Sequence, residues 1–307
     1  MNKSMESGII LLNKKPGITS FDALRDIKRA LGTGKVGHTG TLDKFAQGLL
    51  IVLVGKALKL SRWFSHCDKK YEGRIHFGAE TDTLDPEGTV IAEATPPSRE
   101  KVEEVLSQFR GEIEQAPPVY SAIHVNGQRA SNLARAGLKP EMKKRPVTIY
   151  KLELLSWEPP FADIFVHCSS GTYIRSLARD IALTAGSRAF LCKLVRTQVA
   201  GFKLGDRDLG LGNRINESKI LIYPAPQPLI PILRPIDKSV ISTLGLQCFA
   251  VTEEEAQIIY HGKPLDQILK DKPQFPSAAI FCGENLVAVV EKDGGKWKYA
   301  CVMSNLS

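Results

Sequence analysis

The 307-residue sequence lacks the spacing patterns that mark a bound metal or a disulfide framework. Its six cysteines are scattered without a C-x-x-C pair, and its six histidines show no H-E-x-x-H motif. We therefore expect reduced thiols and no protein-bound metal. Long apolar runs are also missing: segments such as 48–55 are too short to cross a bilayer. The first residues favour a strand over a signal peptide, which predicts a cytoplasmic protein that does not bind membranes.

The charge that is present is mostly positive. Lysine and arginine total 41 against 33 acidic residues, a net charge of +8. The segment 126–151 holds seven basic residues and one acid, Glu141. Two interpretations remain open on composition alone: a solvated loop, or a basic arm that lies along a polyanion such as nucleic acid. The seven basic residues are Arg129, Arg135, Lys139, Lys143, Lys144, Arg145 and Lys151.

Hydrophobic periodicity predicts a mixed α/β chain. Alternating or continuous apolar segments indicate strands at 8–12, 49–54, 73–78, 89–92 and 161–168. Helical spacing indicates helices at 20–31, 98–109 and 172–184, the first two capped by Ser20 and Ser98. The side chains expected to face inward from the first and third helices are Phe21, Leu24, Ile27 and Leu31, and Ile174, Leu177, Ile181 and Leu183.

The chain divides near a proline-rich stretch. Five prolines between 224 and 235 exclude a regular helix or a central strand there. Beyond it, Thr252 and Glu255 form a capping box at the start of a short helix, and compact strands follow at 278–281, 286–290 and 297–303. We predict a large domain over 1–240 and a small β-rich domain over 246–307.

A glycine-rich segment at 32–37 formally matches G-x-G-x-x-G. The dinucleotide-binding interpretation requires a strand before it and a helix after it, whereas here a helix precedes. A Walker A motif also fails, because Val36 follows Lys35. The sequence context therefore disfavours a nucleotide-binding enzyme built on this segment, and the glycines are expected to serve turns and close backbone approach.

Asp43 follows this segment, and its role is ambiguous from its position alone. An aspartate near a turn usually caps or closes that turn. Arg175 lies at an expected strand-to-helix junction, where most arginines form surface ion pairs. If the two side chains met in a partly dry pocket, the arginine would keep the carboxylate ionised. Tyr71 and Tyr173 are equally open to two interpretations, core aromatics or stacking surfaces for a nucleobase.

Eight short segments follow one another along the chain: LNKKPGITS at 12–20, GHTGTLD at 37–43, KY at 70–71, TDTLD at 81–85, QAPPVYSA at 115–122, LARAG at 133–137, GTYIR at 171–175 and LCKLVRT at 191–197. Taken together, these segments resemble the TruB family, the tRNA pseudouridine-55 synthases of bacteria. They occur in family order over about 8–205, and the tail after 246 resembles the small RNA-binding PUA-type domain more weakly.

The resemblance implies a pseudouridine-synthase fold, an α/β (α+β) arrangement whose mixed, mostly antiparallel central sheet is flanked by helices. It implies an enzyme that isomerises uridine 55 in the tRNA T-loop without a cofactor, acting as a monomer on the T-arm. Asp43 matches the family's nucleophile, Tyr71 the tyrosine stacked on the target uracil and implicated in proton transfer, and Arg175 the arginine paired with the aspartate.

Further roles follow from the same match. His38 corresponds to the histidine that fills the space of the flipped-out base, Tyr173 and Leu194 to pocket residues, and Lys14 to a lysine that supports the site. The segment 126–151 corresponds to a basic RNA-clamping insertion. The residues expected to contact the RNA backbone are Arg129, Lys143, Lys144, Arg145 and Arg196.

The sequence departs from the family pattern at five positions. After Lys14 the motif proline is displaced by one residue, so that Lys15 stands in its place and Pro16 follows. Lys44 replaces the proline that usually follows the aspartate, His124 replaces a lysine, Ser131 a tyrosine and Val195 an arginine. The nucleophile and the pocket are unaffected by these changes. Two alternatives remain. One is a non-catalytic tRNA-binding or folding module, for which the tail and the basic insertion would suffice, and the other is a nucleotide-binding enzyme built on the glycine-rich segment.

Overall fold

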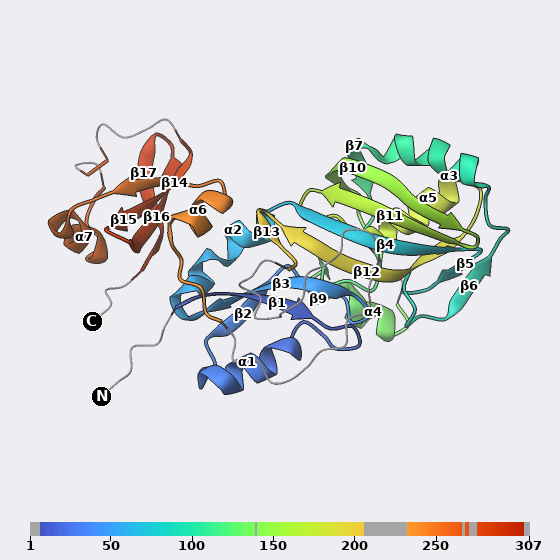
Figure 1. The fold of residues 1–307 in the computed structure, drawn as a ribbon, viewed down its shortest axis with the longest axis horizontal. Coiled ribbons are helices and arrows are strands. Elements are labelled where there is room, and N and C mark those ends of the chain that lie inside the picture. The colour runs from blue at the N-terminus through green and yellow to red at the C-terminus, as the bar shows by residue number, and fades with distance from the viewer. Residues whose placement is uncertain (1–6, 139, 206–231, 266–267, 270–274, 304–307) are drawn as a thin grey trace.

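The computed structural model describes residues 7–138, 140–205, 232–265, 268–269 and 275–303. In this part of the chain, the central element is a nine-stranded sheet (Figure 1). Its main path is β1-β3-β12-β4-β11-β10-β7, with β2 paired to β3 and β13 to β12. The bounds are β1 Gly8–Lys14, β2 Val36–Thr39, β3 Gln47–Val54, β4 Lys69–Phe77, β7 Gly111–Gln115, β10 Arg145–Glu158, β11 Phe161–Cys168, β12 Ala189–Val199 and β13 Phe202–Lys203.

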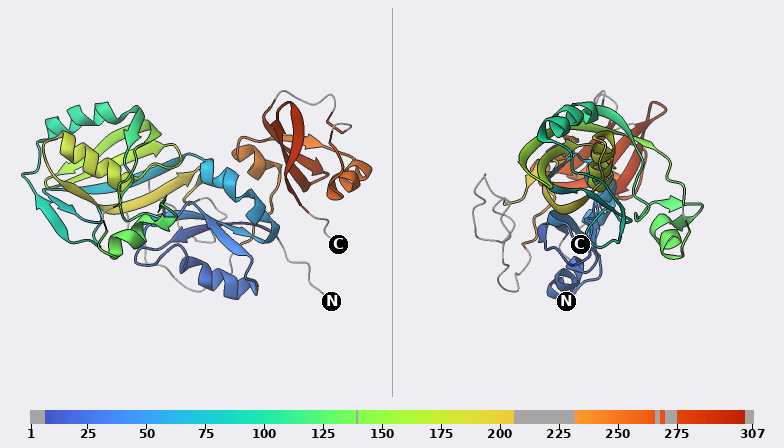
Figure 2. Two further views of the ribbon diagram at one scale, coloured as in Figure 1. Left: turned by 180° about the vertical axis from the view of Figure 1, so that it is seen from behind. Right: turned by 90° about the vertical axis from the view of Figure 1, so that its right-hand side faces the viewer.

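The sheet is mostly antiparallel, as predicted, since only the β12–β3 pair is parallel among its pairings. Along β4, buried and half-buried residues alternate, so Tyr71, Ile75 and Phe77 share the buried face. Helices α3 (Arg99–Leu106) and α5 (Ile174–Thr184) cover that face (Figure 2) and close the main core against it. The order of strands brings β3, β12 and β4 next to each other.

Smaller elements connect these strands. Helix α1 lies beside β2, and a two-stranded ribbon of β5 and β6 and the hairpin β8–β9 flank the sheet. Their bounds are α1 Ala23–Leu31, η1 Gly55–Leu60, α2 Ser61–His66, β5 Ala79–Thr81, β6 Val90–Glu93, η2 Ser107–Phe109, β8 His124–Val125, β9 Gln128–Arg129 and α4 Ala130–Arg135.

The C-terminal part forms a separate four-stranded sheet in the order β14-β15-β16-β17. An apolar cluster continues from the large domain into it, in which Phe64 and Phe202 belong to the same core as Phe281 and Met303. An ion pair between Arg62 and Glu291 lies at the same junction. The bounds are α6 Lys238–Thr243, β14 Gln247–Ala250, α7 Glu253–Tyr260, β15 Ser277–Cys282, β16 Asn285–Asp293 and β17 Lys296–Val302.

Several local predictions are confirmed and others are wrong. Ser98 caps α3, and Thr252 forms the capping box of α7. Ser20 does not cap α1, because its hydroxyl is buried against the backbone of Leu42. Phe21 and Leu183 are exposed, because Phe21 precedes α1, which begins at Ala23, and Leu183 lies outside the buried face of α5.

The basic segment 126–151 divides into two parts. Residues 145–151 are the first half of β10 and pair with β7 and β11, so they belong to the central sheet and not to an insertion. The part before Arg145 contains β9 and α4, and β8 lies just before the segment. Lys139 and most of the proline-rich stretch lie outside the described residues.

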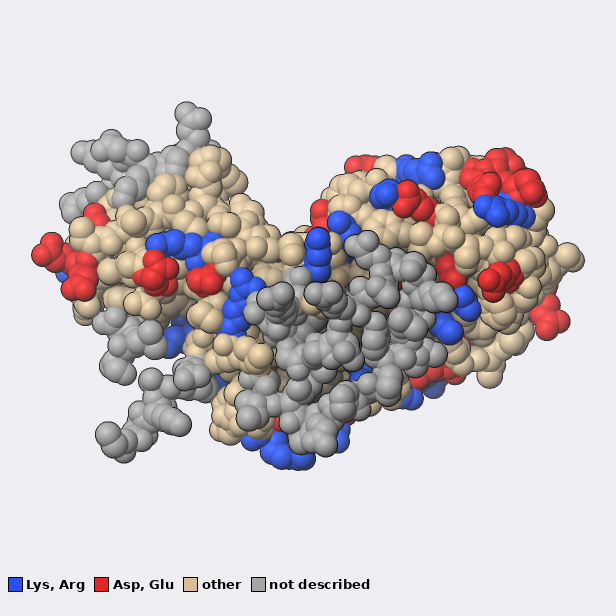
Figure 3. All heavy atoms as spheres, in the orientation of Figure 1, with Lys and Arg blue, Asp and Glu red and all other residues tan. Residues whose placement is uncertain are grey.

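Surface charge does not by itself locate a binding face. In the view of Figure 3, acidic side chains gather over α3 and basic ones over α1, with both signs interspersed between them. No helix in the described ranges is long and apolar enough to cross a membrane.

Candidate active site

Asp43 lies in the loop between β2 and β3, and two buried side chains fasten this loop. Ser20 and Leu42 exchange two hydrogen bonds of 2.9 Å, the hydroxyl donating to the Leu42 carbonyl and accepting from its N–H. Lys14, 1% exposed, donates through Nζ to the carbonyls of Lys15 (2.9 Å), Ile18 (2.7 Å) and Lys44 (3.3 Å). The aspartate is thus presented from a loop that is held at both sides.

Arg175 holds the carboxylate of Asp43 with two nitrogens. Nη2 donates to Oδ1 at 3.0 Å, and Nε lies 2.8 Å from Oδ2. The arginine side chain is 5% exposed, whereas that of Asp43 is 36% exposed. One hydrogen bond and a second close contact from the buried side fix the orientation of the carboxylate. One edge of the carboxylate remains open to an approaching reactant.

The remaining donors of Arg175 are also occupied. Nη1 donates to the Thr83 carbonyl at 2.7 Å and to Oδ2 of Asp85 at 3.2 Å, and Nη2 donates to the Tyr120 carbonyl at 3.0 Å. The arginine is the second residue of α5, so the rigid helix start and two loops converge on it. Two carboxylates and two carbonyls meet one cation, which locks the loops around Asp43.

Asp85 is a site residue that sequence reasoning did not single out. It is 6% exposed, and its Oδ1 accepts from the Thr83 hydroxyl at 2.6 Å and from the Glu87 N–H at 3.0 Å. Burial raises the pKa of its carboxyl, while Thr83 and Arg175 oppose that rise. The available signal was the acidic turn TDTLD, whose last aspartate precedes a proline.

Lys44, which departs from the family pattern, links the same two loops. Its ammonium lies 3.0 Å from a carboxylate oxygen of Glu87, and both side chains are about half exposed. Its carbonyl accepts from the Gly17 N–H at 2.8 Å and from Lys14. The contact therefore joins the Asp43 loop to the Asp85 turn on the outside of the site.

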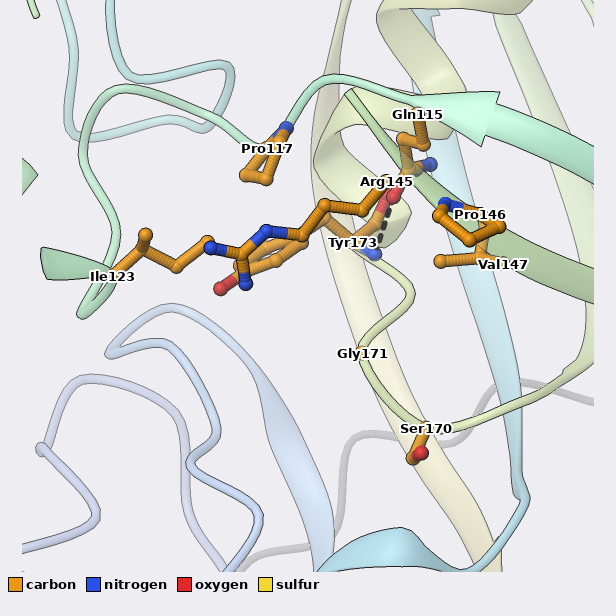
Figure 4. A pocket seen from close by; sticks show the side chains of 9 residues that line it. All are labelled: Gln115, Pro117, Ile123, Arg145, Pro146, Val147, Ser170, Gly171 and Tyr173. Atoms are coloured by element: carbon orange, nitrogen blue, oxygen red, sulfur yellow. Dashed lines mark hydrogen bonds between the residues drawn. The ribbon is translucent and has the colours of Figure 1, made fainter. Parts of the chain in front are cut away.

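Tyr173 immediately precedes α5 and is fastened through its backbone. The Gln115 side chain accepts from the Tyr173 N–H at 2.8 Å and donates to its carbonyl at 3.1 Å. A pocket opens beside it, lined among others by Gln115, Ile123 and Gly171. Figure 4 shows Arg145 extending across this pocket from the start of β10. The pocket lies next to the Asp43 site, with Tyr173 between the pocket and the Asp43–Arg175 pair.

Tyr71 and Leu194 lie on the buried face of the sheet, 8% and 6% exposed. Burial raises the pKa of Tyr71 to about 12, and Arg196 opposes that rise. His38, on β2, has a pKa lowered by burial and by the positive charge of Arg196, so its ring is neutral at pH 7. The Coulombic influence of Asp43 reaches both Tyr71 and Tyr173, which places the three side chains in one neighbourhood.

One predicted RNA-backbone contact is wrong. Arg196 is 1% exposed and donates through Nε to the Leu49 carbonyl at 2.7 Å, so it is inside the fold and not on an RNA-facing surface. The reason is its strand: β12 runs through the middle of the sheet between β3 and β4. The other expected contacts, which are all exposed, are Arg129, Lys143, Lys144 and Arg145.

No group of three or more metal-ligating side chains occurs within the described ranges. The sequence carries a match to the family model described as the N-terminal domain of TruB family pseudouridylate synthases, over residues 28–174. A relative from Treponema denticola is 35% identical over 99% of both chains. The chain belongs to the TruB family.

Other relatives agree with this membership. One from Francisella tularensis is 38% identical and covers 96% of this chain and 94% of its own length, and one from Borreliella burgdorferi is 46% identical over 67% and 74%. Each bears the name tRNA pseudouridine synthase B. A Cbf5–Nop10–Gar1 crystal structure matches with a TM-score of 0.65 at 24% identity, over 94% of this chain and 79% of that one, which supports the fold.

The TruB family members are pseudouridylate synthases, so the chain is assigned to a family of isomerases. The geometry agrees with such chemistry. The site presents a half-exposed carboxylate paired with a buried guanidinium, beside two tyrosines and a histidine whose pKa burial lowers. A preorganised charged group at the edge of a water-poor site is suited to nucleophilic or proton-transfer steps.

Proposed function

We propose that this protein converts uridine 55 in the T-loop of tRNA to pseudouridine, with Asp43 as the nucleophile. The relatives named tRNA pseudouridine synthase B support the substrate class. The observation that carries the role of Asp43 is its two-nitrogen contact with Arg175, which leaves the carboxylate 36% exposed. A purely structural ion pair has no need of an open edge.

The reaction breaks the N1–C1′ bond, turns the uracil and forms a C5–C1′ bond within one nucleotide. No electrons leave or enter, so we propose that no redox cofactor or ATP takes part. Asp43 acts by adding to C6 or C1′, or by removing the C2′ proton. Each route requires the ionised carboxylate, which the Arg175 contact favours.

The target base has to leave its stack before it reaches Asp43. Extrusion costs a few kcal/mol. In this proposal, Tyr71 and Tyr173 offset part of that cost by stacking, His38 occupies the vacated space and Leu194 lines the pocket. Lys14 supports the loop that carries the nucleophile.

Binding of the T-arm is assigned to exposed cations near the site, with the chain acting as a monomer. Arg145 is the best placed of them, because it spans the pocket beside Tyr173 (Figure 4). Arg129 lies on β9, and Lys143 and Lys144 lie in the loop that leads into β10. Phosphate contacts of this kind release counterions, so the affinity for tRNA should fall steeply with salt.

The test is to incubate the protein with an unmodified tRNA transcript and map pseudouridine chemically at every uridine. We expect product at position 55 and none in a transcript that carries cytidine there. Product at another uridine only would overturn the site assignment. Binding without any product would favour the non-catalytic tRNA-binding or folding module.

A further inference from the structure

Arg196 lies directly opposite Tyr71 in the central sheet. The two residues are registered partners on β12 and β4, so their side chains point to the same face. On its other side, the backbone of Arg196 packs against Gly48 of β3, where a Cβ would lie 2.4 Å from the Arg196 carbonyl oxygen. Gly48 also has a φ of +107°, so only glycine suits this crossing. The arginine is thus held tightly beside the tyrosine.

The positive charge of Arg196 is only partly compensated by the groups around it. Nε donates to the Leu49 carbonyl, but Nη2 is buried without a hydrogen-bond partner among the described residues. No carboxylate there forms an ion pair with it. A buried cation without an anion costs several kcal/mol, which structural needs alone do not explain. The groups whose pKa values its charge lowers are Lys14 on β1, His38 on β2, and Lys69 and Tyr71 on β4.

Tyr71 is the neighbour whose chemistry would use that charge. Burial disfavours its phenolate, and the charge and hydrogen bonding of Arg196 are what oppose this effect, whereas Cys168 and Asp43 add to it. A permanently charged guanidinium is the side chain that can do so without itself losing a proton.

We propose that Arg196 is a positioning residue that holds the Tyr71 hydroxyl and supplies the positive charge beside it, so that Tyr71 can take the proton from C5 of the uracil. The proposal rests on the function proposed above. The neutral Tyr71 hydroxyl first gives its own proton to water, and the charge of Arg196 stabilises the phenolate that this leaves. The phenolate oxygen accepts the C5 proton as the C5–H electron pair forms the C5–C6 double bond. The displaced pair goes to N1, which takes a proton from water, or to Asp43 where that carboxylate is bonded to C6. Tyr71 is then a neutral phenol again, and its proton exchanges with water.

The test is a double-mutant cycle on a tRNA transcript that carries tritium at C5 of its uridines, since the reaction releases this label to water. Tyr71→Phe keeps the ring, and Arg196→Met keeps the length of the side chain. We expect each to lower the single-turnover rate about 100-fold, the size of a general-base effect, with the tRNA dissociation constant within about threefold. The double variant should fall no more than about threefold further, because both changes remove the same function.

Arg196→Lys keeps the charge and should recover at least about tenfold of the rate lost in Arg196→Met. Arg74→Met is the matched control: Arg74 lies on the opposite face of β4, paired bidentately with Asp163, and its loss should leave the rate within about twofold. If Arg196→Met does not fold, the cycle is run with Arg196→Lys. The decrease in single-turnover rate that Arg196→Lys causes on its own should then be absent when Tyr71→Phe is already present.

Multiplicative losses in the cycle would overturn the proposal and assign Arg196 a structural role. The same holds for a weaker tRNA affinity at unchanged single-turnover rate, or for no recovery in Arg196→Lys. The release of tritium to water and the formation of pseudouridine in the tRNA are measured first, with the wild-type protein. Their absence would overturn the proposed function itself, so the two failures are distinguishable.

Discussion

Two buried arginines on neighbouring elements are satisfied in opposite ways. Arg175 pairs with two carboxylates and donates to two backbone carbonyls, so its charge is compensated even though Nε makes no hydrogen bond. Arg196 donates to the Leu49 carbonyl, and among the described residues its Nη2 has no hydrogen-bond partner and no carboxylate pairs with it. The first arrangement is expected to spread positive charge over fixed anions. The second leaves positive charge available to a neutral neighbour, Tyr71.

The difference separates orientation from activation. The guanidinium of Arg175, paired with two carboxylates, fixes the geometry of Asp43 and exerts little electrostatic effect on groups beyond these partners. An unpaired one shifts the acid–base behaviour of the groups around it, which the lowered pKa values of Lys14 and Lys69, both about 8, illustrate. Desolvation is the larger cause in both lysines, and Arg196 adds to it.

The largest effect is expected from removing the charge that Arg175 orients. Asp43→Asn keeps the shape but not the nucleophile, and should lower the single-turnover rate by at least about 10⁴-fold. The tRNA dissociation constant should stay within about threefold. Rates are measured by tritium release, and appreciable turnover by the variant would refute the assignment of the nucleophile.

The second prediction compares the stability cost of the two arginines. Arg175→Met leaves Asp43 and buried Asp85 without their cation, which should cost about 3–5 kcal/mol of unfolding free energy. Arg196→Met leaves no carboxylate without a cation. It should therefore lower the unfolding free energy by at least 1 kcal/mol less than Arg175→Met does, a difference of about one charged hydrogen bond. Urea unfolding of both variants checks this. Equal costs would mean that Arg196 is as fully paired as Arg175.

The third prediction uses the pH dependence of stability. The pKa of Lys14 falls from 10.5 in the unfolded chain to about 8 in the fold, chiefly through burial, so between these values the unfolded chain binds more protons. Wild-type stability should therefore rise relative to Lys14→Met as pH increases, by about 1 kcal/mol between pH 8 and pH 9. A difference that stays flat over this window would show that the ammonium is not disfavoured in the fold.

The smallest effect is expected at Lys44. Its ion pair with Glu87 is exposed, and such pairs contribute about 0–1 kcal/mol. Lys44→Gln should leave the single-turnover rate within about twofold and the unfolding free energy within about 1 kcal/mol. A rate loss above tenfold would instead give this ion pair a part in orienting Asp43.

Much of the fold could be predicted from the sequence because its periodic strands and family segments are local signals. The expected strands at 8–12, 49–54, 73–78 and 161–168 are confirmed as parts of β1, β3, β4 and β11. The strands β10 and β12 were not predicted. Each contains two register shifts that interrupt the two-residue alternation, and each carries charged residues that a local pattern assigns to loops.

The site was predicted only in part for a related reason. The pairing of Asp43 with Arg175 was anticipated and is present, while their catalytic roles stay predictions. Asp85 and the burial of Arg196 depend on which strands are neighbours, a property that no local window contains. Arginine is also rarely buried, so the sequence favoured a surface contact for Arg196.

The apolar cluster that contains Phe64, Phe202, Phe281 and Met303 has a consequence for modularity. Because large side chains from both sheets share one core, removing the small sheet would leave the large one with an aromatic surface in water. The two sheets should therefore unfold in one cooperative transition. The C-terminal part is then an integral part of the folding unit and not a separable domain.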